Sequence, residues 1–459
     1  NIIQQKSNNY LASIFFEKNS IGIAFLDIST GEFLVSQGNS EYIDKLLQGF
    51  KPNEVIFQKS RHREFVETFG DRFYTYGLDD WAYSADYATE TLLKHFEVLS
   101  LKGFGIDRMS TAIVAAGVAL HYLNENEHRN LQHISAISRI EEERFMWLDR
   151  FTIRNLELVG SSNDNAITLV DILDHTCSPM GARLLRRWIV MPLKDRKPIE
   201  ERLNVVEYLY TNKELRESLL HEIRQVGDLE RLISKIGLQK ANPREVLQLK
   251  RALHAISKLK TICQSTESKS LRTIADQFNT CDLTRDRIER ELHEEAPVAV
   301  IKGNVIADGV DEELDKLRKI AFGGKELLLE IQRREAEITG IPSLKVAFNN
   351  VFGYYLEVTN AHKDKVPEGW LRKQTLVNAE RYITPELKEY EEQILGAEEK
   401  IFVLETRLYQ ELVYALAEYI KPIQLNAQLV GQLDVLLNFA TLAQKNYYVK
   451  PEVDDSSVI

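Results

Sequence analysis

The sequence contains little cysteine and no long apolar run. Its 459 residues include three cysteines, Cys177, Cys263 and Cys281, which are scattered and form no C-x-x-C pair. Such a set argues against a disulfide framework or a zinc site and fits a reducing compartment. The most apolar stretch, Ala112 to Leu120, is far shorter than the ~20 residues that span a bilayer, and no N-terminal signal pattern is present. We therefore expect a cytoplasmic protein that does not enter a membrane.

The sequence also lacks a recognisable catalytic motif. Gly323-Gly324-Lys325-Glu326 is similar to the end of a phosphate-binding loop, but the earlier glycine and the Ser or Thr after the lysine are missing. His221 and His293 each precede a glutamate, but neither has a second histidine four residues on, as a zinc-protease helix requires. No nucleophile elbow or pair of catalytic carboxylates stands out. We expect this chain not to be an enzyme and to hold no metal or cofactor.

Length and hydrophobic periodicity indicate several domains. A chain of 459 residues exceeds the size at which a single core stops growing, so two or three domains are expected. Residues 1–127 alternate between extended and helical patterns, which predicts an α/β domain. The predicted strands are Ile21–Asp27, Gly31–Val35 and Glu54–Phe57, and the predicted helices are Glu41–Leu47 and Met109–Leu123.

Residues 128–329 follow an almost wholly helical pattern. The exception is a short extended entry at Leu156–Ser162, and Pro179-Met180-Gly181 starts or breaks a helix that Pro192 ends. Arg183, Arg186 and Arg187 line this helix and are candidates for a phosphate site. Because apolar residues interleave with them, we favour a core helix with a solvated basic face.

Two long, narrow-striped helices flank a small region of alternating residues. The helices are predicted at Asp311–Thr339 and Pro385–Ile420, and the second could reach roughly 50 Å. Between them, the alternation over Leu344–Thr359 predicts a hairpin, and Leu371–Ile383 predicts a third extended piece. Thr384 is a suitable cap for the second helix. We expect the two helices to run antiparallel and to hold the small sheet at their far end.

This small sheet carries a local excess of positive charge. Residues 343–382 contain six Lys and Arg against four Asp and Glu, whereas the whole chain has 58 against 69, a net charge of −11. A basic island with many amide side chains suits contact with phosphates without reading of bases. The alternative is that these are ordinary solvated residues of an exposed sheet.

Several long strings resemble the MutS family of DNA mismatch repair proteins. GYYLEVTN and LRKQTLVNAERYITPELKEYE are similar to the family's clamp, and Arg154–Leu203 to the start of its core domain. Ile23–Gln37 and Phe104–Leu123 are similar to its connector domain. The resemblance implies a multi-domain fold, α/β plus mainly α. It has a ribonuclease H-like connector (1–127), a helical core with the first lever helix (128–329), a small β-rich clamp (330–383) and a second antiparallel lever helix that returns to the core (384–459).

The resemblance also implies a function for the whole protein. A dimeric clamp of this family surrounds duplex DNA, recognises mispairs and signals to MutL in an ATP-dependent way. ATP and magnesium act in a C-terminal domain, and a Phe-x-Glu motif in an N-terminal domain reads the mismatch. We expect the C-terminal domain to be absent, because the chain stops at Val449-Lys450-Pro451-Glu452 and DDSSVI, where that domain would begin. We expect the N-terminal domain to be absent because no Phe-x-Glu motif has the family's context, and Asn1 in place of an initiator methionine also suggests a fragment. Phe15-Phe16-Glu17 and Phe65-Val66-Glu67 match the spelling of the motif but not its context.

For this chain the expected activity is weak, sequence-independent and salt-sensitive binding of double-stranded DNA. The predicted DNA-binding residues are Lys363, Arg372, Lys373, Asn378 and Arg381.

Two alternatives belong to other functional classes. A ribonuclease H-like nuclease would use Asp27 with Asp107 and Glu32, but two-metal hydrolysis needs converging carboxylates and their spacing is not diagnostic. We therefore favour Asp27 as a turn residue at the end of a strand. The other alternative is an interaction scaffold, for example a MutS relative that acts in recombination.

Overall fold

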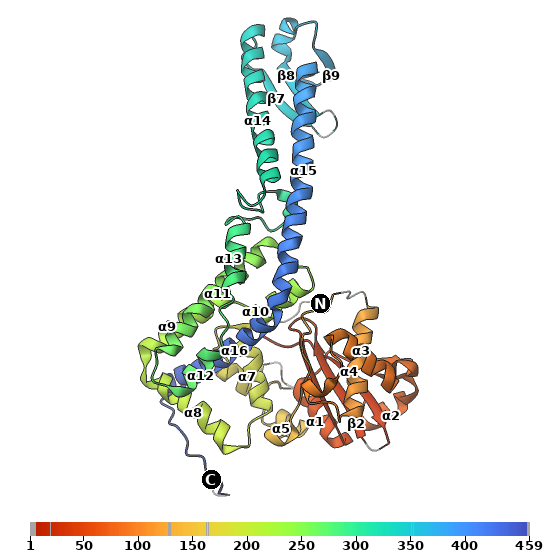
Figure 1. The fold of residues 1–459 in the computed structure, drawn as a ribbon, viewed down its shortest axis with the longest axis vertical. Helices are drawn as coiled ribbons and strands as arrows, with labels where there is room; N and C mark the ends of the chain where they lie inside the picture. Colours follow the sequence, from red (N-terminus) through yellow and green to blue (C-terminus); the bar gives the residue numbers. More distant parts are fainter. Residues whose placement is uncertain are drawn as a thin grey trace. The chain divides into compact units, whose positions relative to one another are not determined.

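The computed structural model describes residues 6–18, 20–126, 130–161, 163, 165–349, 351 and 353–456, which are drawn in Figure 1. The chain forms two compact units. The first unit comprises residues 1–241, 245–288 and 413–459, and the second comprises residues 242–244 and 289–412. Within the part of the chain that the structure describes, no helix combines the length and apolarity needed to cross a membrane.

The first unit contains a six-stranded mixed sheet. Strands β1 (Leu11–Glu17), β2 (Ser20–Asp27) and β3 (Glu32–Gly38) form an antiparallel meander. β4 (Glu54–Gln58) pairs parallel to β1, β5 (Thr75–Leu78) parallel to β4, and the short β6 (Ser138–Arg139) parallel to β3. The strand order is therefore β5-β4-β1-β2-β3-β6. β1 and β2 are almost entirely buried, so both faces of the sheet are covered.

Helices pack on both faces of this sheet. One face meets α1 (Ser40–Phe50) and α2 (His62–Phe69), and the other meets α3 (Ala85–Phe96) and α4 (Ser110–Glu125). Small residues let α4 pack very close to β2 and to α3. A Cβ atom at Gly22 would lie 2.0 Å from the Thr111 carbonyl oxygen, and one at Gly117 would lie 2.5 Å from Ala88. The predicted helix of small apolar residues is thus confirmed as a buried central helix.

The rest of the first unit is helical and is arranged around α16 (Ile420–Asn446). α16 packs against α7, α8, α9 and α10. Its buried Asp434 accepts hydrogen bonds from the backbone N–H groups of Cys177 (2.9 Å) and Ser178 (2.7 Å), at the start of α7. The other helices are α5 (Arg150–Asn155), α6 (Leu169–Leu173), α7 (Pro179–Val190), α8 (Arg196–Thr211), α9 (Lys213–Val226), α10 (Leu229–Gly237), α11 (Pro243–Gln264), α12 (Lys269–Gln277) and α13 (Asp282–Glu291).

The second unit is built on two long helices, α14 (Glu312–Thr339) and α15 (Pro385–Leu416). Three contacts show that they run in opposite directions. Arg318 pairs with Glu405, Gly324 lies against Ile394, and Arg334 pairs with Glu386. As residue numbers rise along α14, the residue numbers of the partners on α15 fall. The two helices are therefore antiparallel, as predicted from the sequence.

A four-stranded antiparallel sheet lies between these helices in the chain. Its strands are β7 (Lys345–Asn349), β8 (Gly353–Thr359), β9 (Leu371–Thr375) and β10 (Ala379–Ile383), in the order β7-β8-β10-β9. The β7–β8 hairpin is confirmed, and the Leu387 N–H donates to Thr384 Oγ1 (3.1 Å), as predicted for the helix cap. The prediction of one extended piece after this hairpin was wrong. Leu371–Ile383 folds back as a second hairpin through Val377-Asn378.

Two further differences concern the first unit. Leu156–Ser162 was predicted to be extended, but its described residues form turns and Glu157 has a positive φ of 46°. Strand β1 was not predicted, although it lies at the centre of the sheet.

The predicted domain boundary after residue 127 falls on 127–129, outside the described residues. The two units also divide the chain at other positions than the predicted domains, since α14 and α15 belong with the small sheet.

Candidate nucleic-acid interface

The small sheet of the second unit has one apolar face and one polar face. Leu356, Val358 and Tyr382 are buried in a cluster with Leu328 of α14 and Ile394 of α15. Because side chains alternate along a strand, their neighbours lie on the opposite face. Cross-strand pairing aligns these neighbours into one row, formed by Lys345, Glu357, Arg381 and Gln374.

Arg381 lies in the middle of this polar row and is held by its neighbours. Its Nε donates to Glu357 (3.1 Å) and its Nη1 donates to Gln374 (2.8 Å). The guanidinium carbon lies 4.3 Å from the centroid of the Tyr355 ring, within range of a cation–π interaction. Of its five N–H donors, those not used by these two bonds remain for an external group. Arg381 therefore stabilises the sheet before it contacts any ligand.

Arg372 lies at the edge strand and pairs with an acid of the neighbouring strand. Its Nη1 is 3.3 Å from Glu380, which also accepts a hydrogen bond from the Tyr382 hydroxyl. The Tyr382 hydrogen bond and the nearby charges of Arg372 and Lys363 lower the pKa of Glu380. Glu380 thus stays ionised at neutral pH and offsets part of the positive charge of Arg372.

The predicted lysines differ from the arginines, because no ion pair within the described residues involves them. Lys373 is exposed at a register shift in the β9–β10 pairing, where it has no cross-strand partner. Lys363 is exposed in the 3₁₀ segment η6 (Asn360–Lys365). Lys345, which was not among the predicted DNA-binding residues, is also exposed and lies in the polar row. These three lysines are the bases best placed to meet an external anion.

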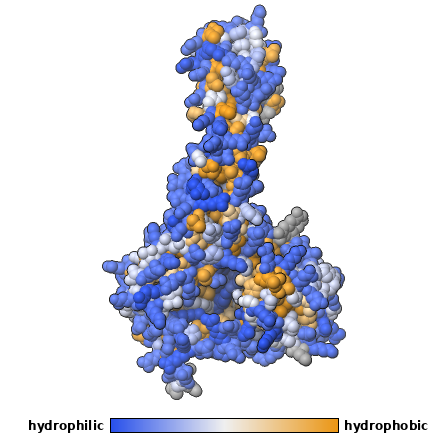
Figure 2. All heavy atoms as spheres, in the orientation of Figure 1, coloured by the Kyte–Doolittle hydropathy of each residue, from blue (hydrophilic) through white to orange (hydrophobic). Residues whose placement is uncertain are grey.

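Asn378 lies in the turn between β9 and β10 and is exposed. Its carbonyl accepts the Asn360 N–H (3.1 Å), and the Asn360 side chain donates to the Val377 carbonyl (2.8 Å). These bonds hold the η6 segment, with Lys363, beside the turn. Val377 and Val351, in the two hairpin turns, have exposed fractions of 92% and 78%. The second unit thus carries exposed apolar side chains in its two hairpin turns, on a surface that is mostly hydrophilic (Figure 2).

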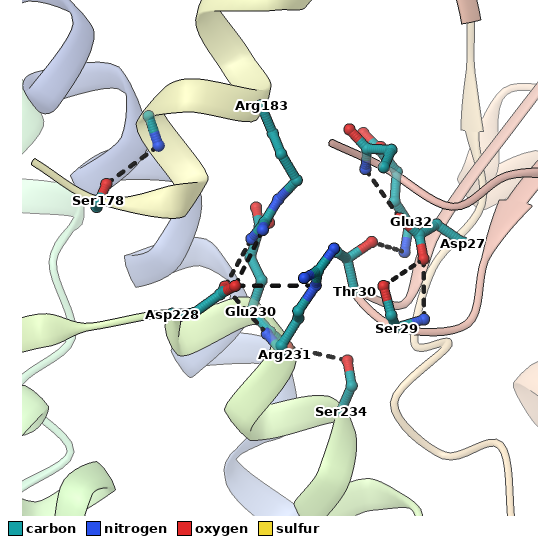
Figure 3. Close-up of polar contacts among 12 residues, drawn as sticks. Asp27, Ser29, Thr30, Glu32, Ser178, Arg183, Asp228, Glu230, Arg231 and Ser234 are labelled. Carbon is teal, nitrogen blue, oxygen red and sulfur yellow. Dashed lines mark hydrogen bonds and ion pairs between the residues drawn. The ribbon is translucent and has the colours of Figure 1, made fainter. Parts of the chain in front are cut away.

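The three arginines of α7 are not a solvated basic face, as had been favoured. Figure 3 shows Arg183 pointing toward Asp228 and Glu230, and its Nη2 lies 2.6 and 2.7 Å from their carboxylates. Arg187 donates to Glu32 of β3 (2.6 Å) and to the Tyr10 hydroxyl (2.7 Å). A sequence pattern cannot reveal these partners, because they lie on distant segments. Two of the three charges are therefore compensated inside the first unit.

Two of the three carboxylates considered for a nuclease, Asp27 and Glu32, are already engaged, whereas Asp107 is exposed in the turn before α4. Asp27 is fully buried and accepts hydrogen bonds from Asn8, from the Asn9 N–H and from Ser29 (Figure 3). Glu32 pairs with Arg187. No group of three or more His, Cys, Asp or Glu side chains among the described residues is placed to hold a metal ion. These contacts favour Asp27 as a structural residue at the end of β2.

Comparison with known proteins finds the same family along the chain. The family model for MutS domain II matches residues 9–135, and the model for MutS domain III matches residues 151–440. The DNA mismatch repair proteins MutS of Parabacteroides distasonis and Bacteroides fragilis are 56% and 54% identical to this chain over 459 residues, which is 100% of the chain and 53% of each relative. That of Flavobacterium johnsoniae is 56% identical over 455 residues, or 99% of the chain and 52% of the relative. The chain thus spans about half the length of the curated relatives it matches.

Proposed function

The chain belongs to the MutS family of DNA mismatch repair proteins, and we propose that it supplies the connector, helical core and DNA clamp of a protein that binds mispaired duplex DNA. The observation that carries this proposal is the match of two consecutive family models over 9–135 and 151–440. In this assignment residues 1–127 are the connector, and the small sheet of the second unit is the clamp.

We also infer that the connector is ribonuclease H-like and that α14 and α15 act as levers. The order β3-β2-β1-β4-β5, with three antiparallel strands followed by two parallel ones, supports the first inference. The antiparallel contacts along α14 and α15 support the second, because a helix pair with an ion pair toward each end can transmit motion without bending. In this role the clamp moves with its helices.

The polar face and turns of the clamp are the proposed contact with the DNA backbone. Lys363 and Lys373 would neutralise phosphates directly, since neither forms an ion pair among the described residues. Arg372 and Arg381 would add N–H donors that their internal partners do not use, and Asn378 would add an amide. Phosphate contacts carry no sequence information, so this binding is expected to be independent of sequence and of mispairing.

For the whole protein we propose the partners and cofactors that the family implies. ATP and magnesium would act in a region to which neither matched family model corresponds, and this chain alone would show no ATPase activity. MutL and a second copy of the protein would be partners, and the cytoplasm would be the location. These proposals rest on family membership.

Fluorescence anisotropy tests the DNA-binding proposal. A labelled duplex, fully paired or with a single mismatch, is titrated with the chain at several salt concentrations. We expect equal binding of both duplexes. In a plot of the logarithm of the binding constant against the logarithm of the salt concentration, the slope should fall in magnitude by about 0.9 for each phosphate contact that Lys363→Ala or Lys373→Ala removes. This slope is the salt slope of duplex binding. The matched control is Lys102→Ala, which removes an exposed lysine of the first unit. Unchanged slopes in both clamp variants would reject the assigned residues, and no binding at low salt would favour an interaction scaffold.

A further inference from the structure

A cavity of about 240 Å³ in the first unit is lined by positive charge only. Its walls come from the segment before β1, the end of α1 and one side of α7. The charged residues that line it are Lys51, Arg183, Arg186 and Arg187, and no Asp or Glu is among the lining residues. Asn8 and Asn53 add amide groups to the same lining. A cavity lined by four cations and no acid is suited to an anion.

Two of the four cations are already compensated from outside the cavity. Arg183 pairs with Asp228 and Glu230, and Arg187 pairs with Glu32. These carboxylates take up the charge of both arginines without entering the lining. The remaining charges in the cavity are those of Lys51 and Arg186.

Arg186 has no ion pair or hydrogen bond within the described part of the chain, and its buried Nε atom is without a partner. Asp171 is close enough for the charge of Arg186 to act on it, but its carboxylate is used by the Thr168 hydroxyl and N–H, at 2.6 and 3.0 Å. Leaving a buried guanidinium donor unsatisfied is costly. An oxyanion in the cavity would remove that cost.

Lys51 brings the second charge to the same place. It caps the end of α1 with a φ of 47°, in the left-handed region, and its side chain lines the cavity. Its Nζ would lie 3.6 Å from a Cβ atom built on Gly160. Burial of the ammonium and the nearby charge of Arg186 both lower the pKa of Lys51. Two like charges held together in this way repel each other unless an anion lies between them.

We propose that this cavity is a binding site for a phosphate group, held between Arg186 and Lys51. The volume is slightly below the ~300 Å³ at which drug-sized pockets begin, which favours inorganic phosphate or a small phosphate monoester. Charge-assisted hydrogen bonds from a guanidinium and an ammonium are the usual means of holding such a dianion. The site is separate from the clamp and does not depend on DNA binding.

A bound phosphate would join the two matched domains. Lys51 and Asn53 fall within the MutS domain II match, whereas Arg186 falls within the MutS domain III match. Binding would therefore stabilise the packing of the connector against α7, in addition to the Arg187–Glu32 pair.

Isothermal titration calorimetry and thermal unfolding with inorganic phosphate test this proposal, with sodium chloride at equal ionic strength as the reference. Wild-type chain is expected to bind phosphate with a Kd of ~1 mM or tighter and to unfold at a higher temperature in its presence. Arg186→Gln and Lys51→Gln should each weaken binding by about tenfold or more. Arg63→Gln is the matched control, because the Arg63 side chain is 91% exposed and far from α7 in sequence.

Stability without phosphate distinguishes a ligand site from a structural role. If Arg186 and Lys51 only hold the fold together, each Gln variant should be less stable than wild type in chloride. A binding site predicts variants that are equally or more stable in chloride, because the repulsion is relieved, and that gain nothing from phosphate. Ribose 5-phosphate should compete with inorganic phosphate, whereas a duplex with a 5′-phosphate should not. Absence of phosphate binding by wild type, or unchanged binding by Arg186→Gln, would overturn the proposal.

Discussion

Gly324 of α14 lies directly against Ile394 of α15, so closely that a Cβ atom on the glycine would be 2.4 Å from Ile394 Cγ1. The preceding Gly323 has nothing within 4 Å of the same position. Two adjacent glycines therefore have different roles. One allows the two long helices to approach, and the other only makes α14 more flexible.

This contrast predicts opposite effects of the same substitution. Gly324→Ala should destabilise the second unit by ~1–3 kcal/mol, because the new methyl group forces Ile394 or the helix backbone to move. Gly323→Ala should stabilise it by up to ~1 kcal/mol through helix propensity alone. Urea unfolding of both variants measures the difference, and equal effects would mean that the helices adjust freely at this contact.

Arg183 is expected to be among the residues most important for stability. Its side chain is 3% exposed and serves two carboxylates at once. Arg183→Ala should cost ~3–5 kcal/mol, because it removes the counter-charge of Glu230 and leaves Asp228 with only the longer ion pair to Arg231, at 3.8 Å. Arg63→Ala, which breaks an exposed pair with Glu67, should change the unfolding free energy by less than ~1 kcal/mol. Denaturant unfolding of the two variants checks this, and similar costs would contradict the buried network.

The Arg187–Glu32 pair should make stability depend on pH in a defined direction. Burial alone would raise the pKa of Glu32, but the Arg187 charge and the hydrogen bonds from Arg187 and Tyr10 outweigh it and lower the pKa below its usual 4.5. A carboxylate with a lowered folded-state pKa contributes stability above about pH 4.5, and this contribution is lost as the pH falls through the folded-state pKa.

Glu32→Gln is the variant that tests this direction, because its amide does not titrate. It should be less stable than wild type at neutral pH, and the gap should narrow as the pH falls below about 4.5. Thermal unfolding from acidic to neutral pH gives the comparison. A gap that stays constant over this range would show that the charge of Glu32 contributes nothing.

Arg381 and Lys373 should separate stability from DNA binding. Arg381→Lys keeps the charge but loses the geometry toward Glu357, Gln374 and the Tyr355 ring, so we expect a cost of ~1–3 kcal/mol. Lys373→Ala should leave stability within ~0.5 kcal/mol, since Lys373 is exposed, and should lower the salt slope of duplex binding. Unfolding and anisotropy measurements on the same two proteins test both statements. A stable Arg381→Lys variant would show that the row across the sheet does not depend on the guanidinium.

The fold was predictable where local pattern and chain order suffice. Helical spacing located α14 and α15, alternation located the β7–β8 hairpin, and Thr384 marked the start of α15. Which side chains of the candidate site have partners within the sheet was not predictable to the same degree. Whether Arg381 is held or free depends on the register that places it opposite Glu357, and the isolation of Lys373 depends on a register shift.

The α7 arginines show the same limit over a longer distance. Residue type and helical spacing identified Arg183, Arg186 and Arg187 as a group, but their individual environments differ completely. The carboxylates that compensate Arg183 are 45 and 47 residues away, and the one that compensates Arg187 is 155 residues away. Only the packing of the sheet, α7 and α10 brings them together. Periodicity therefore predicts which residues share a helix, and tertiary structure decides which of them keep a free charge.

The central position of α16 has a consequence for synthesis on the ribosome. α7 ends at Val190 and packs on α16, which begins only at Ile420, about 230 residues later. At roughly 5–20 residues per second, the nascent helices α7 to α10 wait on the order of 10–50 s for the helix that covers them. The sheet domain before them can fold in that interval, because its strands and covering helices are complete by Arg139. Newly made copies therefore expose the apolar faces of α7 and α8 for a defined period, and this is the stage at which a chaperone would be most useful.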